Sequence, residues 1–261
     1  MEANLNGIRV RFDDVGTGPV VLLLHAFPLS AAMWQPQIEA LRSRYRVIAP
    51  DLRGFGGSDA PPGPYSMDTL ADDAAALLEY LGVSRAVVAG LSMGGYIAFA
   101  FWRRHRDRVA ALVLADTRAG ADSEEGRATR EVNARLAEEQ GAGAIADKLI
   151  PGLVAPGAPQ AVRDTLRALI TANSPDGIAG ALRGMAARPD SNPDLPGIDV
   201  PALIIVGEED GLTPPVESER IAAALPDATL ARIPGAGHLS NLEQPEAFNA
   251  ALLAFLERLP S

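Results

Sequence analysis

Short apolar runs that recur along the chain constrain its fold more than any other feature of the sequence. Pro19–His25 (PVVLLLH) is a continuous apolar run, which is typical of a strand buried on both faces. Further strand-like runs of this kind are Tyr45–Asp51, Ala86–Ser92, Val109–Asp116 and Pro201–Gly207. Helical patterns separate these runs, and alternating strands and helices are typical of an α/β fold. The sequence therefore predicts a mostly parallel central sheet with helices on both faces.

One long segment interrupts this alternation. Between Thr117 and Ile198 no buried-strand run occurs, but three amphipathic helical patterns do. Their apolar residues are Val132 and Leu136 in the first, Val162, Leu166, Leu169 and Ile170 in the second, and Ile178, Leu182 and Met185 in the third. Glycine- and proline-rich clusters (GAGA, PGLVAPGAP and PDSNPDLPG) separate the patterns. We expect residues 1–116 and 199–261 to form a core domain, and residues 117–198 to form an inserted helical cap or lid.

Charge and composition argue against several kinds of partner. The formal net charge is −10 and the isoelectric point about 4.8, which disfavours binding to nucleic acid or an anionic membrane. The chain has no cysteine, so a disulfide framework or a cysteine-based metal site is excluded. The first ten residues lack the basic and apolar regions of a signal peptide, and VVLLL is too short to span a bilayer. We expect a cytoplasmic protein without a membrane partner, a metal or a cofactor; its oligomeric state stays open.

Ser92 lies in a glycine-rich turn, AGLSMGGYIA (Ala89–Ala98), between a predicted strand and a predicted helix. A sharp strand-to-helix turn strains the residue at its tip and brings strand and helix so close that neighbours such as Gly90 and Gly94 must lack side chains. The serine would stand beside the amide of Met93 at the positive end of the helix, which suits a nucleophile that attacks a carbonyl. The motif also fits an ordinary glycine-rich turn, so its meaning depends on a base and an acid elsewhere.

Three histidines are candidates for the base. Ligand sites in parallel sheets lie at the carboxyl ends of the strands. His105 ends the helix that follows Ser92, a helix length away from the turn, and is expected at the surface. His25 lies at a strand end, where we expect it to hold the following loop by hydrogen bonds. His238 lies in the glycine-bounded loop after the last predicted strand, and its place after both candidate acids favours it as the base.

The acid must hold the imidazole tautomer and offset the charge that the ring acquires. Asp210, in the loop GEEDGLTP, follows a buried strand and is our first choice. Its neighbours Glu208 and Glu209 are expected to be solvated. Asp116, after the preceding strand, is the alternative, although it could instead cap the first inserted segment or pair with Arg118.

Five segments, taken together and in this order, resemble the α/β-hydrolase fold family. LLLHAFP looks like the family's H-G-x-P oxyanion segment, and DLRGFGGSD looks like its D-x-R-G-x-G-x-S segment. GLSMGG matches the nucleophile elbow, GEEDGLTP the acid loop and GAGH the histidine loop. The resemblance extends over nearly the whole chain and keeps the family's order of serine, aspartate and histidine.

By this resemblance Ser92 is the nucleophile, His238 the base and Asp210 the acid of a catalytic triad. The backbone N–H groups of Phe27 and Met93 would form the oxyanion hole. The resemblance implies no metal and no cofactor.

Other positions are assigned structural or binding roles. Arg53 and Ser58, in DLRGFGGSD, look structural and would tie that loop beneath the site. Ala26 stands where the family usually has glycine, and alanine tolerates positive φ poorly, so the loop could follow a different path there. Four residues are expected to supply apolar walls for the substrate, two of which (Trp34 and Tyr96) fit a core role equally well: Phe27, Trp34, Met93 and Tyr96.

A serine at the elbow implies acyl chemistry, because epoxide hydrolases and haloalkane dehalogenases of this fold use aspartate there to form an alkyl-enzyme ester. The segments HAFPLSAAMW and GLSMGGYIA look like those of small carboxylesterases, cofactor-free perhydrolases and enol-lactonases. We expect a serine esterase for small to medium esters. Lactone opening, perhydrolysis and C–C hydrolysis are alternatives, as is a non-enzymatic ligand receptor. A lactonase for a charged substrate would need an arginine in the insertion. Arg118, Arg130, Arg135 and Arg163 are candidates, although an insertion this rich in arginine would contain them in any case.

Overall fold

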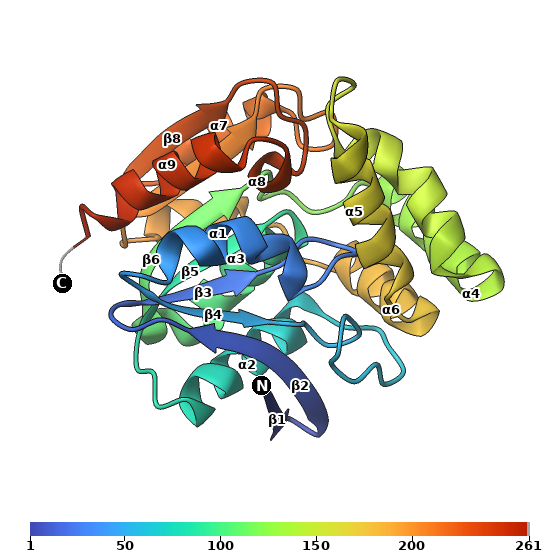
Figure 1. The fold of residues 1–261 in the computed structure, drawn as a ribbon, viewed down its shortest axis with the longest axis horizontal. Coiled ribbons are helices and arrows are strands. Elements are labelled where there is room, and N and C mark those ends of the chain that lie inside the picture. The colour runs from blue at the N-terminus through green and yellow to red at the C-terminus, as the bar shows by residue number, and fades with distance from the viewer. Residues whose placement is uncertain (260–261) are drawn as a thin grey trace.

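An eight-stranded sheet forms the centre of the computed structural model, which describes residues 1–259 (Figure 1). In spatial order the strands are β1 (Glu2–Leu5), β2 (Ile8–Val15), β4 (Arg46–Pro50), β3 (Val20–Leu24), β5 (Ala86–Leu91), β6 (Val109–Ala115), β7 (Ala202–Gly207) and β8 (Ala228–Ile233). β2 pairs antiparallel with both β1 and β4, and the other neighbouring strands are parallel. The predicted mostly parallel sheet is confirmed.

Helices cover both faces of this sheet (Figure 1). α2 (Met67–Tyr80) packs beside α3 (Met93–His105), and α1 (Gln35–Leu41) packs beside α9 (Pro245–Leu256) on the opposite face. α7 (Pro215–Ala224) packs on β7 and β8, and the short α8 (Ser240–Glu243) precedes α9. Because both faces are covered, the central strands are buried throughout, which explains their unbroken apolar runs. Within residues 1–259, no helix combines the length and the apolar character that crossing a membrane requires.

The parallel strands bring distant polar residues to one edge of the sheet. β3, β5, β6 and β7 are successive neighbours, with Leu24 opposite Gly90 and Leu91 opposite Ala115. Ser92 directly follows β5, and Asp116 directly follows β6. The carboxyl ends of these strands are therefore the place where side chains from separate parts of the sequence meet.

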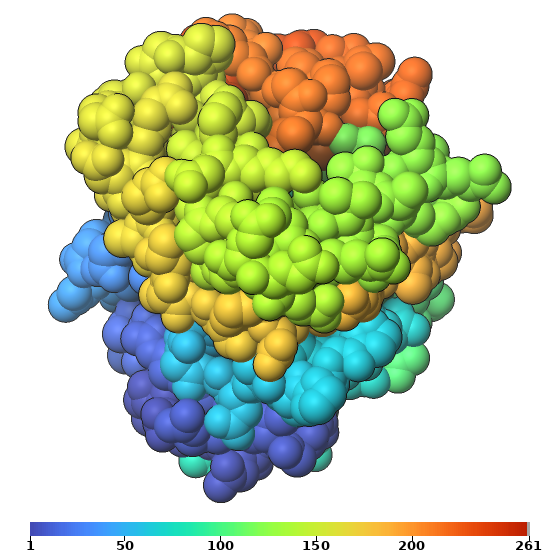
Figure 2. Space-filling view, turned by 90° about the vertical axis from the view of Figure 1, so that its right-hand side faces the viewer, coloured from blue at the N-terminus to red at the C-terminus, as the bar shows by residue number. Residues whose placement is uncertain are grey.

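Three helices, which we call the insertion helices, lie between β6 and β7 in the chain: α4 (Glu124–Leu153), α5 (Gln160–Thr171) and α6 (Pro175–Ala186). α4 packs against both α5 and α6, and all three lie together on one side of the molecule (Figure 1). Figure 2 views this side: the yellow-green and yellow atoms of the insertion helices spread between the blue and cyan N-terminal part and the orange C-terminal part.

The first insertion helix agrees with its prediction in one respect and differs in another. Gly141, in the GAGA cluster, is non-helical (φ 81°, ψ 177°) and separates two helical segments of α4, the second of which ends at Leu153. Val132, expected on the buried face, is 59 % exposed. The face that packs against the protein carries small and polar side chains instead, and a pattern of large apolar residues cannot reveal such a face. Its buried residues before the bend are Asn133, Ala134 and Ala137.

Glycines allow the backbone of α6 to contact the core directly. A Cβ atom at Gly184 would lie 1.6 Å from the carbonyl oxygen of Tyr65, and a Cβ atom at Gly177 would lie 1.9 Å from that of Gly54. Tyr65 N donates a hydrogen bond of 3.0 Å to the carbonyl oxygen of Gly180. The helix backbone thus touches the loops before α2 without intervening side chains, which fixes its distance from the sheet.

This direct contact predicts a difference between two glycine-to-alanine substitutions in the insertion helices. Gly184→Ala should lower the free energy of unfolding by about 1–3 kcal/mol, because the added methyl group has no room. Gly143→Ala, in α4, has nothing within 4 Å of the new Cβ atom and should raise it by up to about 1 kcal/mol. Urea denaturation of both variants measures the difference; equal effects would contradict the direct contact between α6 and Tyr65.

Candidate active site

Ser92 occupies the tight turn that joins β5 to α3. Its φ of 54° and ψ of −111° lie in a region that residues with side chains rarely adopt. Hydrogen bonds hold this conformation from both sides: Ser92 N donates to the carbonyl oxygen of Ala115 at 2.9 Å, and Thr117 Oγ1 donates to the carbonyl oxygen of Ser92 at 2.9 Å. The Ser92 side chain does not cap α3, so its hydroxyl is left for other partners.

The glycines around Ser92 are required by the close approach of backbone segments. A Cβ atom at Gly90 would lie 2.1 Å from the carbonyl oxygen of Gly94, and one at Gly94 would lie 2.1 Å from that of Leu24. At Gly95 the added atom would lie 2.5 Å from Thr117 Oγ1. The prediction that these neighbours must lack side chains is confirmed.

His238 reaches Ser92 from the loop between β8 and α8. Its Nε2 atom lies 2.8 Å from Ser92 Oγ, and its Nδ1 atom lies 2.8 Å from Asp210 Oδ2. Both His238 and Asp210 are buried. The three residues that the motifs singled out are therefore joined in one chain of hydrogen bonds.

Thr213 fixes the carboxylate of Asp210. The Thr213 hydroxyl donates to Asp210 Oδ2 at 2.6 Å, and its amide donates to Oδ1 at 2.9 Å. The amide of Leu212 donates to the same Oδ1 atom at 2.8 Å. The sequence analysis missed Thr213, although a threonine three residues after an aspartate in a loop is a typical partner for such a turn.

Asp116 lies nearby but has other partners. Its Oδ1 atom accepts from Gly207 N at 2.8 Å, and its Oδ2 atom accepts from the Ser240 hydroxyl at 2.5 Å. Its φ is 45°, and its side chain is fully buried. The structure therefore places Asp210, and not Asp116, in hydrogen-bond contact with His238. Asp116 ties the carboxyl end of β7 to α8, and Arg118, one of the alternative partners considered for it, is not in hydrogen-bond contact with it.

Burial and charge shift the pKa values of these groups. Burial raises the pKa of Asp116 to about 7. Burial acts in the same direction on Asp210, but the hydrogen bond and the charge of His238 outweigh it, so the pKa of Asp210 is lowered. Burial alone would lower the pKa of His238. Its hydrogen bond with Asp210 and the charges of Asp210 and Asp116 raise the pKa above 6.5, against a smaller opposing effect of Arg118.

Glu243 organises the loop that carries His238, and the sequence analysis did not single it out. Its Oε1 atom accepts from the amides of Gly237 at 3.0 Å and Leu239 at 3.3 Å, on either side of the histidine. Its Oε2 atom accepts from Ala155 N at 2.8 Å, just beyond α4. One buried carboxylate therefore joins the histidine loop to the insertion. A glutamate five residues after the histidine was the only signal in the sequence.

The other two histidines lie outside this chain. His25 is buried; its Nε2 atom accepts from Leu52 N at 3.0 Å, and its Nδ1 atom lies 2.9 Å from the carbonyl oxygen of Ala26. Burial lowers the pKa of His25 to about 4, so the ring is neutral and holds two loops together. His105 Nε2 lies 2.8 Å from a carboxylate oxygen of Asp72 on α2, as part of a partly exposed cluster.

Arg53 and Ser58 hold the second loop. Both Nε and Nη2 of Arg53 donate to the carboxylate of Asp73 on α2, at 2.7 and 2.8 Å. The Ser58 hydroxyl donates to the carbonyl oxygen of Asp51 at 2.6 Å and accepts from Arg11 N at 2.9 Å. Neither residue lines the cavity over Ser92. In the described chain, no cluster of three or more histidine, cysteine, aspartate or glutamate residues has the arrangement needed to hold a metal ion.

Two backbone amides are available near Ser92. Met93 is the first residue of α3, so its N–H group has no acceptor within the helix. Phe27 follows β3, and its N–H group finds no acceptor among residues 1–259. Ala26 does not adopt positive φ, which among the described non-glycine residues occurs only at Asn6, Ser92 and Asp116. The alanine therefore fits this loop without backbone strain.

A cavity of about 170 Å³ lies over Ser92 and His238. Phe27 and Tyr96 line it on the side of the core, and apolar side chains of α4 and α6 line it on the other side. The apolar residues from these two helices are Leu149, Leu153, Leu182 and Met185. The rest of the wall consists of Leu212, Thr213 and three further polar residues, Arg118, Arg130 and Asn133.

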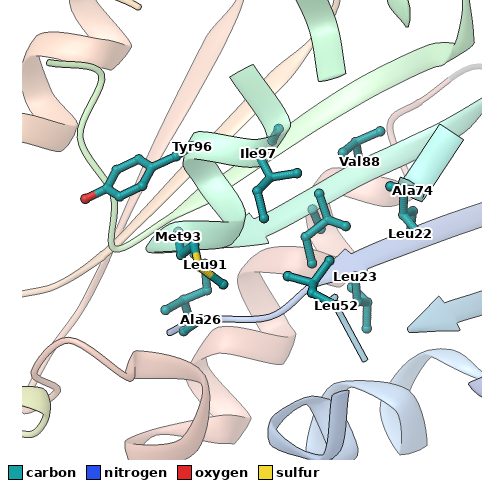
Figure 3. Close-up of a cluster of buried hydrophobic side chains, with 14 of the residues drawn as sticks. Leu22, Leu23, Ala26, Leu52, Ala74, Val88, Leu91, Met93, Tyr96 and Ile97 are labelled. Carbon is teal, nitrogen blue, oxygen red and sulfur yellow. The ribbon is translucent and has the colours of Figure 1, made fainter. Parts of the chain in front are cut away.

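Two of the four residues expected as substrate walls lie elsewhere. Trp34 is almost fully buried and packs against Phe248, with ring centroids 6.1 Å apart. The Met93 side chain is fully buried and lies with Leu91 and Ala26 in the apolar core (Figure 3). Trp34 therefore has the core role that the sequence left open as an equal alternative, and the interpretation of the Met93 side chain as a pocket wall is wrong. Trp34 belongs to a 3₁₀ turn before α1 that faces α9, and the Met93 side chain turns inward at the start of α3.

The comparison with protein families agrees with the fold and the order of motifs. The family model described as the alpha/beta hydrolase fold matches residues 19–245. This match extends over most of the chain and includes the turn of Ser92, the Asp210 loop and the His238 loop. The chain belongs to the α/β-hydrolase fold family.

Several relatives match along nearly their whole length. A thermophilic esterase from Thermogutta terrifontis, in a structure with malate bound, has 42 % identity and a TM-score of 0.97, covering 100 % of this chain and 99 % of that one. The enol-lactonase from Burkholderia xenovorans has 32 % identity and a TM-score of 0.92, covering 99 % and 100 %. 3-Oxoadipate enol-lactonase 2 of Acinetobacter baylyi is 32 % identical over 244 residues, which are 92 % of this chain and 89 % of that protein.

The geometry predicts which serine reacts with an organophosphonate probe. Ser92 should form the covalent adduct, because His238 Nε2 can accept its proton. Peptide mapping by mass spectrometry locates the adduct, and Ser92→Ala, with circular dichroism as the check on folding, should form none. Ser240 is a fitting control within the same site, since it is fully buried and bound to Asp116. An adduct on Ser240 or on any other residue would contradict the assignment.

Proposed function

We propose that this protein is a serine hydrolase that cleaves small to medium carboxylic esters through an acyl-enzyme, without a cofactor. The observation that carries the proposal is the chain of hydrogen bonds from Ser92 Oγ through His238 to Asp210, in which both links are 2.8 Å. A nucleophile, a base and an orienting acid in this geometry define the triad mechanism. The similarity to the esterase of Thermogutta terrifontis supports the same reaction class.

Acylation follows from the positions of these groups. His238 Nε2 accepts the proton of Ser92 while Oγ attacks the ester carbonyl carbon. Asp210 keeps the Nδ1 proton on the ring and stabilises the positive charge that His238 acquires. The N–H groups of Met93 and Phe27 donate to the oxyanion of the tetrahedral intermediate. His238 then gives its proton to the leaving alcohol, and the acyl group stays on Ser92.

Deacylation repeats these steps with water. His238 accepts a proton from a water molecule, whose oxygen attacks the acyl carbon. Collapse of the second tetrahedral intermediate breaks the bond to Ser92 Oγ, and His238 returns the proton to the serine. The net reaction consumes one water molecule and releases one alcohol and one carboxylic acid. No step needs a metal ion or a redox group.

We further propose that residues 117–198 act as a cap over this site. Side chains of α4 and α6 form the wall of the cavity opposite Phe27 and Tyr96. Glu243 attaches the end of α4 to the loop that carries His238. The cap excludes bulk water, which strengthens the electrostatic stabilisation of the oxyanion.

Lactone opening is the second candidate reaction for the same residues. Two of the relatives are enol-lactonases that match along nearly their whole length. A lactone is a cyclic ester, so the triad would attack it in the same way, and the alcohol would remain attached to the acyl product. A panel of small lactones assayed beside open-chain esters distinguishes the two reactions.

The proposal predicts unequal effects of two aspartate substitutions. Asp210→Asn should lower kcat by about 10³–10⁴-fold, because the imidazole loses its preferred tautomer. Asp116→Asn should lower it far less, since an amide oxygen can still accept from Gly207 N. Both variants are compared with wild type on the same aryl ester after their folding is checked. A larger loss in Asp116→Asn would show that the wrong acid has been assigned.

The raised pKa of His238 sets the pH dependence. The base must be neutral, so kcat/KM should fall as the pH drops through a value above 6.5. Asp116 raises the pKa of His238 through its negative charge, so Asp116→Asn should move this inflection to lower pH. Rates on a neutral ester between pH 5 and 9 measure both inflections. An inflection that stays in place or moves upward in the variant would contradict the coupling.

The small cavity predicts a preference for short acyl chains. A volume of about 170 Å³ is below the roughly 300–1,000 Å³ that is usual for drug-sized ligands. The kcat/KM values for aryl acetate and butyrate should therefore exceed those for octanoate and palmitate, and a chelator should leave them unchanged. A palmitate value above the butyrate value, or loss of activity in the chelator, would contradict the proposed pocket and mechanism.

A further inference from the structure

The wall of the cavity over Ser92 has one polar side, which the triad mechanism does not use. Arg118, in the loop after β6, and Arg130 and Asn133, on α4, lie together there. No aspartate or glutamate lines the cavity. The triad mechanism needs neither of these two guanidinium groups, so the partners of each arginine decide whether it is free to bind a ligand.

Arg118 has unused hydrogen-bonding capacity. Its Nη2 atom donates to the carbonyl oxygen of Leu212, but its Nε atom is buried and has no partner. No carboxylate of the described chain lies within 4 Å of Arg118, whereas Arg130 pairs with Asp122. A buried donor on a charged group is costly to leave unpaired, and a ligand with a negatively charged acceptor would satisfy it.

The charges around this side do not balance. Arg188 stacks over the Tyr96 ring at 4.1 Å and also pairs with Asp122, at 2.8 Å. One carboxylate, Asp122, therefore serves both Arg130 and Arg188, and Arg118 has none. The net charge of the chain is −10, so this local excess of positive charge is opposite in sign to the charge of the protein as a whole.

Asn133 adds a second unsatisfied group at the same place. It is only 7 % exposed, and its Oδ1 atom has no hydrogen-bond partner. Arg118, Arg130 and Asn133 also line an outer hollow of about 400 Å³ on the surface of the insertion, together with Asp122 and Glu125. These three residues thus lie at the boundary between the outer hollow and the cavity over Ser92, where a substrate would pass or rest.

We infer that the substrate of this site carries an ionised carboxylate in addition to its ester group. This carboxylate binds to Arg118 at the boundary between the cavity and the outer hollow. Arg130 adds positive charge beside it, whereas the free Asn133 Oδ1 atom is an acceptor and takes no part in binding the carboxylate. The apolar residues of α4 and α6 surround the short chain between the carboxylate and the scissile ester. The inference rests on the ester hydrolysis proposed above: water enters, the acyl C–O bond breaks, and an alcohol, a dicarboxylate and a proton leave.

A pair of matched esters tests this assignment. Monomethyl succinate carries the carboxylate, and methyl 4-oxopentanoate replaces one carboxylate oxygen by a methyl group, so the two have nearly the same shape. Each enzymatic kcat/KM, measured by methanol release, is divided by the alkaline hydrolysis rate of the same ester to remove intrinsic reactivity. The wild-type ratio, anionic over neutral, should be at least about tenfold, as expected for a hydrogen bond to a charged group.

Two arginine variants locate the effect. Arg118→Gln should lower the ratio by at least about tenfold. The ratio is used because loss of the Arg118–Leu212 contact next to Asp210 can also change the rate on the neutral ester. Arg135→Gln removes the same charge from an exposed arginine of α4 that lines neither hollow, and should leave the ratio unchanged.

Binding to Ser92→Ala separates this inference from the esterase proposal. Calorimetry should give tighter binding of monomethyl succinate than of methyl 4-oxopentanoate, whether or not wild type hydrolyses either ester. If neither ester is hydrolysed but the anionic ester binds more tightly than the neutral one, the esterase proposal is refuted and the carboxylate site is not. Hydrolysis of both esters with a wild-type ratio of one or less, equal binding of the two, or a ratio unchanged in Arg118→Gln would overturn the carboxylate site. An equal fall of the ratio in Arg135→Gln would also overturn the carboxylate site, because the preference for the anionic ester would then depend only on the overall charge of the protein.

Discussion

The close contact between β5, α3 and β3 at Ser92 is the constraint on which the rest of the site depends. Gly90 and Gly94 leave no room for a Cβ atom, so the turn can only form with the serine in its strained conformation. That conformation presents the hydroxyl to His238 and leaves the first amide of α3 without an internal acceptor. Hydrogen bonds to Ala115 and Thr117 hold this strained conformation, so β6 and the residue that follows Asp116 also contribute to the position of Ser92.

Much of this arrangement could be predicted from the sequence, because it follows from local patterns. Unbroken apolar runs indicate buried parallel strands, and such strands bring their carboxyl ends to one edge of the sheet. The glycines around Ser92 indicate close backbone contact. Asp210 and Asp116 could not be separated with the same certainty, since both follow buried strands. The three-dimensional structure separates them. Asp210 Oδ2 lies 2.8 Å from His238 Nδ1, whereas the carboxylate of Asp116 accepts hydrogen bonds from Gly207 N and the Ser240 hydroxyl.

The features that the sequence did not reveal depend on contacts between distant segments. The packing face of the first half of α4, before Gly141, carries small and polar residues, so a pattern of large apolar residues gives no signal there. Trp34 has the character of a pocket wall, but α9 covers it. The carboxylate of Glu243 accepts hydrogen bonds from two amides beside His238 and from the amide of Ala155, just beyond α4, and these contacts give the residue its role. No single stretch of sequence contains that information.

The partition of the acyl group between water and an added alcohol tests the central claim, an acyl-enzyme on Ser92, most directly. Phenyl, 4-nitrophenyl and methyl butyrate would be hydrolysed in the presence of ethanol, and the ratio of ethyl butyrate to butyric acid would be measured for each. A common acyl-enzyme predicts the same ratio for all three, because the leaving alcohol has departed before the partition, and Ser92→Ala should form neither product at a comparable rate. A ratio that changes with the leaving group, or one that persists in Ser92→Ala, would contradict the account.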